Sequence, residues 1–456
     1  MANISSAATG DWNATSTWSG GAVPVAGDLV TILNTHNVTL TQDQPAGAVV
    51  INSGGTLTGG GFKLTLNDNA GTTFIFSNVG TISGVLDIDI TGGSVDRPIN
   101  EAGTGNIRNL TINNAQTYLC HYHLTLDGDL TLTAGTLNTQ NSGGTNNNLT
   151  VTGDVIITGG GLVCNSSTVS VNSFTISSGG ILSAPDSSGS LTLNGTKNAW
   201  SFQNNSTGFN HNNGTITQTN AGHIKSVSSN PMYNFIMNSS SSDSHEAVFR
   251  PSSGTDCVIA ANKVTVTRGI VKLNTVSNNA SMGSLTIGST GTFQASSATT
   301  TITSEAGSGY AIEVSGTYTA SAGTLKITTD ANTFVKILDD VNHLIIEPAT
   351  ATRVYEYVNN TTIQGSLTIN AGRFTHYSST YSLDVQGDCA VNNTGILDGG
   401  SGSIEMNTLT VNSGGEYRAT TGTTTITAAS GAPVNGRAWY IHNGATFTHN
   451  NGLCKF

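Results

Sequence analysis

The peptide Ile51-Asn-Ser-Gly-Gly-Thr-Leu57 returns in variant form along the chain and decides the fold. Its copies are Ile176-Ser-Ser-Gly-Gly-Ile-Leu182, Ile287-Gly-Ser-Thr-Gly-Thr-Phe293 and Val411-Asn-Ser-Gly-Gly-Glu-Tyr417. Each copy has an apolar residue, a turn of small residues and then another apolar residue. This recurrence is typical of tandem repeats, in which one repeat is too small to bury its own apolar face.

The repetition extends to longer phrases. Asn109-Leu-Thr-Ile112 is followed by Leu130-Thr-Leu-Thr-Ala-Gly-Thr-Leu137, and both phrases return within residues 234–271 and 343–374. Trp200 with Phe209-Asn-His-Asn-Asn-Gly214 returns as Trp439 with Phe447-Thr-His-Asn-Asn-Gly452. We therefore predict an N-terminal cap or attachment segment at 1–48, a first solenoid section at 49–105, and three larger units at 106–231, 232–341 and 342–456.

Between the turns, apolar residues alternate with hydroxyl residues, as in Leu130-Thr-Leu-Thr133. A period of two is typical of a β-strand with one buried face, and no long segment shows the helical period of 3.6. Coiling the chain so that each turn stacks on the last pairs the strands and joins their apolar faces in one core. The pattern predicts an all-β fold, a parallel β-solenoid of tandem repeats with about 20–25 residues a coil and roughly 18–20 coils. The crossover rule predicts that it is right-handed.

The composition excludes several classes of function. Only 9% of the residues are charged and the net charge is −11, without any run of Lys or Arg, so nucleic-acid binding is not expected. No apolar stretch reaches 18 residues, which argues against membrane insertion. The first residues lack the basic and apolar regions of a secretory signal. The protein would then stay in the cytosol until assembly or lysis, unless a signal has been removed.

The two ends of the chain give separate expectations. The first 48 residues differ from the repeats and contain Trp12, Trp18 and Pro24, which suits a cap over the open edge of a solenoid. After His211-Asn-Asn-Gly214 the chain runs on for about twenty residues to the next unit. The equivalent His449-Asn-Asn-Gly452 is followed by four residues only. We expect that the natural chain continues past Phe456 or pairs there with another chain or domain.

The acidic residues favour turn chemistry over catalysis. A polysaccharide-degrading enzyme needs convergent carboxylates. One close pair, Asp87 and Asp89, is expected to face solvent from a strand. The pair Asp339 and Asp340 is expected in a turn. The Gly-Asp pairs recur at equivalent repeat positions, whereas catalysis needs one copy; they end at Asp129, Asp154 and Asp388. We expect no enzyme activity and no cofactor.

The histidines and cysteines have simple interpretations, with one alternative. His121 and His123 flank Tyr122, so both imidazoles would share one strand face, and in a homotrimer with this face on its axis they could hold a metal ion. Solvated or edge-packed histidines are the simpler interpretation. His211 and His449 are expected to stack in matching turns. Repeat alignment places Cys389 and Cys454 in inward apolar positions, where a free thiol packs as a small hydrophobic group.

Tyrosines are the best candidates for binding. Stacking on a sugar ring needs a flat apolar surface, which an exposed aromatic side chain provides. The tyrosines near unit starts or turns are the candidates for carbohydrate binding, with packing in the core or at an edge as the alternative; they are Tyr118, Tyr122, Tyr355, Tyr357, Tyr377 and Tyr381.

The opening Gly10-Asp-Trp12, Thr17-Trp18-Ser-Gly-Gly21, Pro24 and Gly27-Asp-Leu-Val-Thr-Ile32 resembles the start of β-helical surface proteins of bacteriophage virions and of bacterial adhesins. The repeated Asn-Leu-Thr-Ile, Gly-Asp-Leu-Thr-Leu and His-Asn-Asn-Gly phrases look like the same group over nearly the whole chain. The resemblance implies an extended surface element and supplies neither a receptor nor a reaction.

On this basis we expect a structural protein of the virion surface, a tail fibre, spike or head appendage of a bacteriophage that mediates host attachment. A bacterial extracellular adhesin or filament at the cell surface is the alternative, ranked second because it would have to be exported and a signal peptide is not apparent. A polysaccharide-degrading β-helix enzyme is the third possibility. The expected partners are further copies of the chain, with a trimer as the guess, other virion proteins, and a glycan or protein on the host surface.

Overall fold

The structure is a computed structural model of the 456-residue chain. It describes residues 2–68, 72–93, 97–195, 199–225, 229–251, 255–273, 278–305, 307–338, 341–428 and 437–456. The chain divides into two compact units, Met1–Thr217 and Gln218–Phe456, here called unit 1 and unit 2. Asp339 and Asp340, expected in a turn, lie outside the described residues. The section boundaries expected from the repeats stay a prediction.

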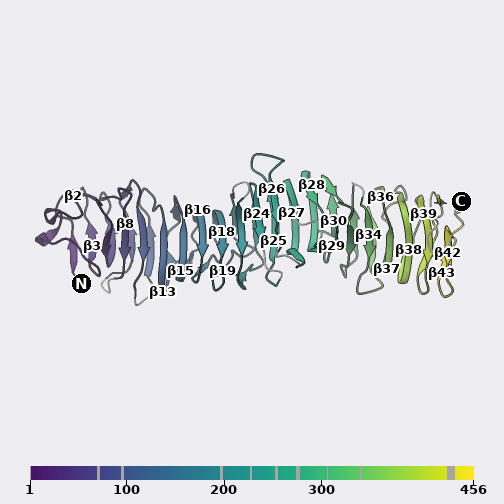
Figure 1. Cartoon of the computed structure of the whole chain (residues 1–456), viewed down its shortest axis with the longest axis horizontal. Coiled ribbons are helices and arrows are strands. Elements are labelled where there is room, and N and C mark those ends of the chain that lie inside the picture. Colours follow the sequence, from purple (N-terminus) through teal and green to yellow (C-terminus); the bar gives the residue numbers. More distant parts are fainter. Residues whose placement is uncertain are drawn as a thin grey trace. The chain divides into compact units, whose positions relative to one another are not determined.

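The described strands of unit 1 form three columns, in which each strand pairs in parallel with its counterpart one coil further on (Figure 1). The first column contains β1 (Asn3–Ser5), β3 (Leu29–Ile32), β6 (Ala48–Ile51), β9 (Phe76–Asn78), β12 (Arg97–Glu101), the ends of β13 (Leu110–Cys120) and β15 (Leu130–Asn138), β17 (Gly161–Val163), β19 (Ile181–Ser183) and β22 (Gly208–Asn210).

The second column of unit 1 contains β2 (Gly10–Asp11), β4 (Asn37–Thr39), β7 (Thr56–Thr58) and β10 (Thr81–Ser83), then β14 (Leu124–Leu126), the starts of β16 (Leu149–Ile157) and β18 (Thr168–Ile176), and β20 (Ser190–Leu193). The third contains β5 (Gln44–Ala46), β8 (Lys63–Leu66), β11 (Asp87–Ile90), the starts of β13 and β15, the ends of β16 and β18, and β21 (Trp200–Asn204). Strand β23 (Thr215–Gln218) spans the boundary between the units.

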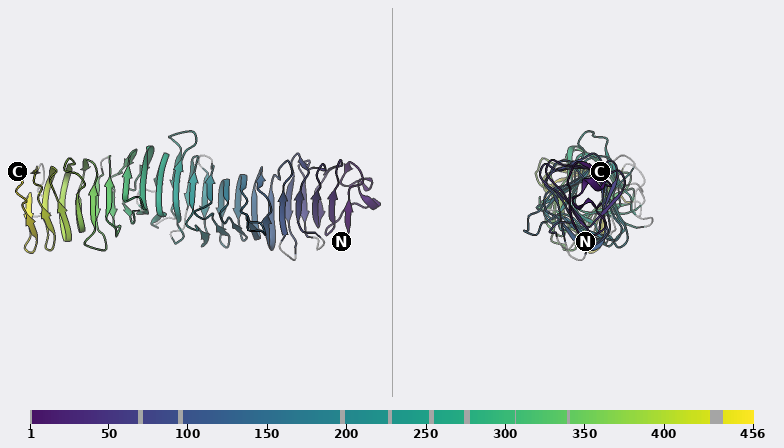
Figure 2. Two further views of the ribbon diagram at one scale, coloured as in Figure 1. Left: turned by 180° about the vertical axis from the view of Figure 1, so that it is seen from behind. Right: turned by 90° about the vertical axis from the view of Figure 1, so that its left-hand side faces the viewer.

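Unit 2 repeats the arrangement of parallel strands side by side (Figure 2), and its long strands pair with strands of two or three columns. Its first column contains parts of β27 (Cys257–Leu273), β28 (Ala280–Gln294), β37 (Leu367–His376), β38 (Leu383–Asp398) and β39 (Ile404–Val411), with β29 (Thr299–Ile302), β32 (Thr324–Ile327), β34 (His343–Ile346) and β42 (Trp439–Ile441).

The second column of unit 2 contains β25 (Met232–Asn238), β30 (Tyr310–Val314), β33 (Thr333–Lys336), β35 (Val354–Tyr357), β40 (Glu416–Arg418) and β43 (Thr446–Thr448), together with the middle or end of the long strands. The third contains β24 (Gly222–Lys225), β26 (Glu246–Phe249), β31 (Thr317–Thr319), β36 (Thr361–Ile363), β41 (Thr423–Ile426) and β44 (Leu453–Lys455).

These columns confirm the predicted parallel β-solenoid, with about 18 turns. The handedness stays a prediction. The only helices in the described part of the chain are the one-turn 3-10 helices η1 (Thr15–Thr17) and η2 (Ser19–Gly21). Neither is long enough to cross a membrane.

The core is a stack of aliphatic and aromatic side chains in register. Leu110 lies beside Leu130, Leu130 beside Val155, and Val155 beside Phe174, and all four are at most 1% exposed. Burying one such side chain contributes about 1.5–3 kcal/mol relative to leaving it in water. The intervening Thr131 and Ile156 point outward and are half-buried. The period of two therefore sorts each strand into an apolar inner face and an outer face, as expected.

The two glycines of the repeated turn are required for different structural reasons. The first adopts a left-handed backbone that L-residues avoid, with φ of 77° at Gly54, 90° at Gly179 and 83° at Gly414. The second lies against the previous coil: a Cβ on Gly415 would stand 2.5 Å from the carbonyl oxygen of Val391. Close stacking of coils thus explains why Gly-Gly recurs.

The predicted cap region already contains the first coils, because β1 pairs with β3 and β3 with β6. Trp12 and Trp18 are buried, with ring centroids 5.0 Å apart in an edge-to-face arrangement. The indole N–H of Trp18 donates to the carbonyl oxygen of Trp12 over 2.6 Å. This aromatic pair packs within the segment between β2 and β3.

Candidate functional site

The candidate site is an aromatic groove on the outside of unit 2, with a volume of about 290 Å³. It is lined by Tyr310, Phe334, Lys336, Val358, Tyr377 and Tyr381. Four of these residues are aromatic, one is aliphatic and one is a lysine, so the groove combines flat apolar rings with hydroxyl and ammonium groups. We call these six residues the aromatic groove.

Stacking of four coils builds the groove. Tyr310 in β30 lies beside Phe334 in β33, and both point outward because their strand neighbours Ala311, Thr333 and Val335 are buried. Tyr377 follows β37 directly, and its backbone N–H donates to the carbonyl oxygen of Tyr357 over 2.9 Å. Residues far apart in the chain are thus brought together by the coil repeat.

The rings of the groove contact each other in sequence. The centroids of Tyr310 and Phe334 are 5.3 Å apart, and those of Phe334 and Tyr377 are 5.4 Å apart with an interplanar angle of 87°. Tyr377 is 62% exposed, which makes it the most accessible aromatic surface of the groove. An exposed ring held at its edge by a second ring offers a flat face for stacking.

Polar groups stand at the margin of these rings. The ammonium of Lys336 lies 3.0 Å from the hydroxyl of Ser315 and 3.7 Å from a carboxylate oxygen of Glu313. The tyrosine hydroxyls add groups that can donate and accept. An apolar face flanked by hydrogen-bonding groups suits a sugar ring, which has a C–H face and a rim of hydroxyls.

The structure divides the six predicted tyrosines into two sets. Tyr118, Tyr355 and Tyr357 are fully buried, so the prediction of a sugar-binding role is wrong for these three. Tyr118 donates its hydroxyl to the carbonyl oxygen of Gly92 over 3.1 Å, and Tyr355 donates to the carbonyl oxygen of Thr329. Burial raises the pKa of Tyr355 and Tyr357 above the usual value. The alternative interpretation, packing in the core, applies to them because they occupy inward positions of their strands.

Tyr377 and Tyr381 lie together in the aromatic groove, and Tyr122 lies apart from it in unit 1. Tyr122 is 49% exposed and contacts His121, whose ring contacts Phe74; the two centroid distances are 5.0 Å and 5.2 Å. Tyr122, Tyr377 and Tyr381 stay predicted binding residues. Sequence reasoning missed Tyr310 and Phe334, although both stand on outward positions of alternating strands.

The expected histidine pair does not lie on a strand. Residues 121–123 form a turn between β13 and β14, so the premise of a shared strand face is wrong. Nδ1 of His123 accepts the backbone N–H of Asn148 over 2.8 Å, which occupies that nitrogen. No group of three or more metal-binding side chains occurs within the chain where the structure describes it.

The acidic candidates are held in structural contacts. Asp87 pairs with Arg108, and Asp89 pairs with Lys63 over 2.8 Å. Among the recurring aspartates, only Asp129 lies between strands, as expected of a turn residue. Asp154 and Asp388 lie within β16 and β38 at shifts in the strand register, so the expectation of a turn is wrong for these two. A carboxylate oxygen of Asp129 accepts the backbone N–H of Asp154 over 2.8 Å, and Asp388 accepts the hydroxyl of Thr408 over 2.8 Å. These bonds join one coil to the next.

Comparison with known proteins gives no family for this fold and groove. No family model, curated protein or solved structure matches the chain.

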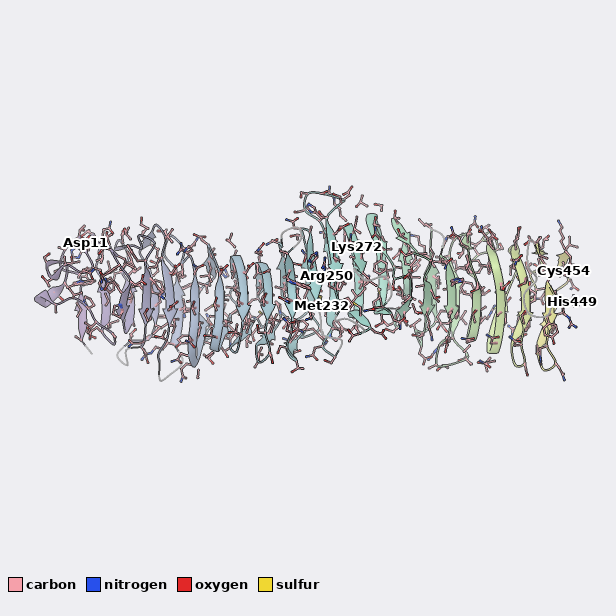
Figure 3. All side chains as sticks on the ribbon, in the orientation of Figure 1. Asp11, Met232, Arg250, Lys272, His449 and Cys454 are labelled. Carbon is pink, nitrogen blue, oxygen red and sulfur yellow. The ribbon has the colours of Figure 1, made fainter. Side chains whose placement is uncertain are left out.

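The remaining candidates have structural roles. The turns at His211 and His449 share one geometry: the imidazole Nδ1 accepts a backbone N–H two residues on, from Asn213 over 2.9 Å and from Asn451 over 3.1 Å. Cys389 is buried in the core, as expected. Cys454 lies in register with Thr424 and is half-buried (Figure 3).

Proposed function

We propose that this protein is a surface appendage of a bacteriophage virion that attaches to a host glycan through the aromatic groove. The observation that carries the binding role is the alignment of Tyr310, Phe334 and Tyr377 on the outer surface of neighbouring coils. The placement on a virion is supported by the resemblance of the opening sequence and the repeated phrases to β-helical surface proteins.

The construction of the chain suits a passive, rigid role. Parallel pairing engages the backbone of each coil with its neighbours, and the core is continuous within each unit. Large motions would break both at once. Among the acidic candidates that the structure describes, Asp87 and Asp89 are in ion pairs. The other three, Asp129, Asp154 and Asp388, accept hydrogen bonds from the next coil. Attachment therefore fits the groove better than cleavage does.

The test is binding of the protein to purified surface polysaccharides and oligosaccharides from candidate hosts, measured on an array and then by calorimetry. Wild-type protein is expected to bind a defined glycan, and Tyr377→Ala to lose most of that affinity. Tyr440→Ala removes a half-buried tyrosine outside the groove and should leave binding unchanged. Equal binding by Tyr377→Ala and wild type would refute the groove as the attachment site.

Separate experiments address the virion placement and the alternatives. Antibodies raised against the protein should label intact phage particles by electron microscopy. Labelling of the bacterial cell surface in the absence of phage would favour the adhesin. Release of reducing ends from the bound glycan would favour the enzyme.

A further inference from the structure

A cluster of basic side chains on unit 2 lies outside the aromatic groove. His223 in β24 is in register with Val248 in β26, and Val248 is in register with Lys272 in β27. Arg250 follows β26, and its backbone N–H donates to the carbonyl oxygen of Ile224 over 2.8 Å. Three successive coils thus place His223, Arg250 and Lys272 on one outer surface; Figure 3 labels Arg250 and Lys272 there.

Arg250 differs from six other arginines of the protein. A carboxylate lies within ion-pair distance of each of Arg97, Arg108, Arg268, Arg353, Arg373 and Arg418. Within the described residues Arg250 has no such carboxylate, and its Nη2 instead lies 3.0 Å from Nε2 of His223. Its buried Nε has no hydrogen-bond partner in the described structure. A guanidinium has five N–H donors, and in the described structure one of them, on Nη2 of Arg250, contacts a side chain.

The charge around Arg250 stays positive. Lys272 lies 2.7 Å from Glu246, so one carboxylate is present for two permanent cations. The pKa of His223 lies below its usual value because its ring is partly buried and because Arg250 and Lys272 are near, against the opposing influence of Glu246. Such a concentration of positive charge is unusual in a chain of net charge −11, and it is the arrangement that binds an anion.

We propose that Arg250, His223 and Lys272 form a binding site for an anionic group, the sulfate ester or the carboxylate of an acidic polysaccharide. The guanidinium would hold two oxygens of the group through paired N–H donors, and Lys272 would contribute charge from the next coil. The inference extends the proposed attachment function by naming acidic glycans as its ligand class. It does not need the aromatic groove, which lies on other coils.

The test measures binding of the whole chain to immobilised sulfated dextran, polygalacturonate and unsubstituted dextran at low salt. We expect Arg250→Gln to weaken binding to a charged polymer by roughly tenfold or more, and Lys272→Gln by a smaller factor. Arg268→Gln is the matched control, since it removes the same charge from a neighbouring position where Asp243 already neutralises it. It should change affinity by less than about twofold.

The two polymers separate the two sources of charge. A loss confined to sulfated dextran identifies a sulfate ester, and a loss confined to polygalacturonate identifies a carboxylate. Equal losses in Arg250→Gln and Arg268→Gln, wild-type affinity in Arg250→Gln, or no binding of wild type to either charged polymer would overturn the proposal. Circular dichroism checks that each variant is folded. Tyr377→Ala should keep its binding to charged polymer, so failure of the groove and failure of this site are distinguishable.

Discussion

The ring of Tyr377 stands edge-on to the ring of Phe334, with 5.4 Å between their centroids. The two residues belong to different coils, and the contact leaves most of Tyr377 exposed. A surface aromatic that is held in place loses little conformational entropy when a ligand stacks on it, which favours binding.

Replacement of Tyr377 by alanine should therefore reduce glycan affinity by about tenfold while changing the free energy of unfolding by less than about 0.5 kcal/mol. The reason is that the exposed ring contributes to the binding surface and little to the core. Calorimetric titration and urea denaturation measure the two quantities. Loss of stability in parallel with loss of affinity would contradict the assignment.

Leu132→Asp should unfold unit 1 locally and cost more than about 4 kcal/mol, because a carboxylate would stand in the dry core. Thr131→Asp places the same side chain one residue away, on the outer face, and should be tolerated. Urea denaturation of both variants measures the difference. Equal destabilisation would mean that the strand is not sorted into inner and outer faces.

Asn392→Ala should lower the free energy of unfolding by about 1–3 kcal/mol because it leaves two hydrogen bonds unmade. The side-chain amide of Asn392 donates to Asn370 over 2.9 Å and accepts from Asn412 over 2.6 Å, which links three coils. Asn443→Ala changes an exposed asparagine outside this ladder and serves as the control. If both variants melt at the wild-type temperature, the ladder contributes nothing.

Glu101 should make stability fall as pH rises. Burial raises its pKa from the usual 4.5 to about 8, against the opposing effect of the hydrogen bond from Asn78. The folded chain then holds a proton that the unfolded chain releases, so the free energy of unfolding decreases between pH 4.5 and about 8. Urea midpoints across this range measure the slope.

Glu101→Gln should flatten that slope, because the amide stays neutral at every pH. Glu405→Gln alters an exposed carboxyl and should leave it unchanged. A wild-type slope in Glu101→Gln would show that other groups cause the pH dependence.

Thiol chemistry gives a simple check of the core. Cys120, Cys164, Cys257 and Cys389 are buried, and burial raises the pKa of Cys120, Cys257 and Cys389 to about 12. Native protein should react with a thiol reagent at the half-buried Cys454 and at the four others only after denaturation. Rapid labelling of Cys389 in the native state, identified by peptide mass, would be incompatible with a packed core.

Much of the fold could be predicted because the relevant information is local. The turn at Ile51-Asn-Ser-Gly-Gly-Thr-Leu57 and the alternation at Leu130-Thr-Leu-Thr133 show short strands, tight turns and a repeat. The recurrence of the Gly-Asp pairs indicated a structural position, but only Asp129 lies in a turn, since Asp154 and Asp388 lie within strands.

The tyrosines show where local information ends. In Val354-Tyr-Glu-Tyr357 the alternation places Tyr355 and Tyr357 on one face of the strand, but it fits either face as the inner one. The burial of both residues shows that this face is the inner one. The same ambiguity hid Phe334, whose neighbours Thr333 and Val335 turned out to be the buried pair.

By itself, then, the amino-acid sequence determined the strand period, the turn positions and the coiling of the chain, because hydrogen bonding and burial repeat every few residues. Only the tertiary structure decided which faces look outward and which distant residues meet. Tyr310, Phe334 and Tyr377 become neighbours through the number of residues in each intervening coil, and that length, unlike the alternation, is set by how the coils stack.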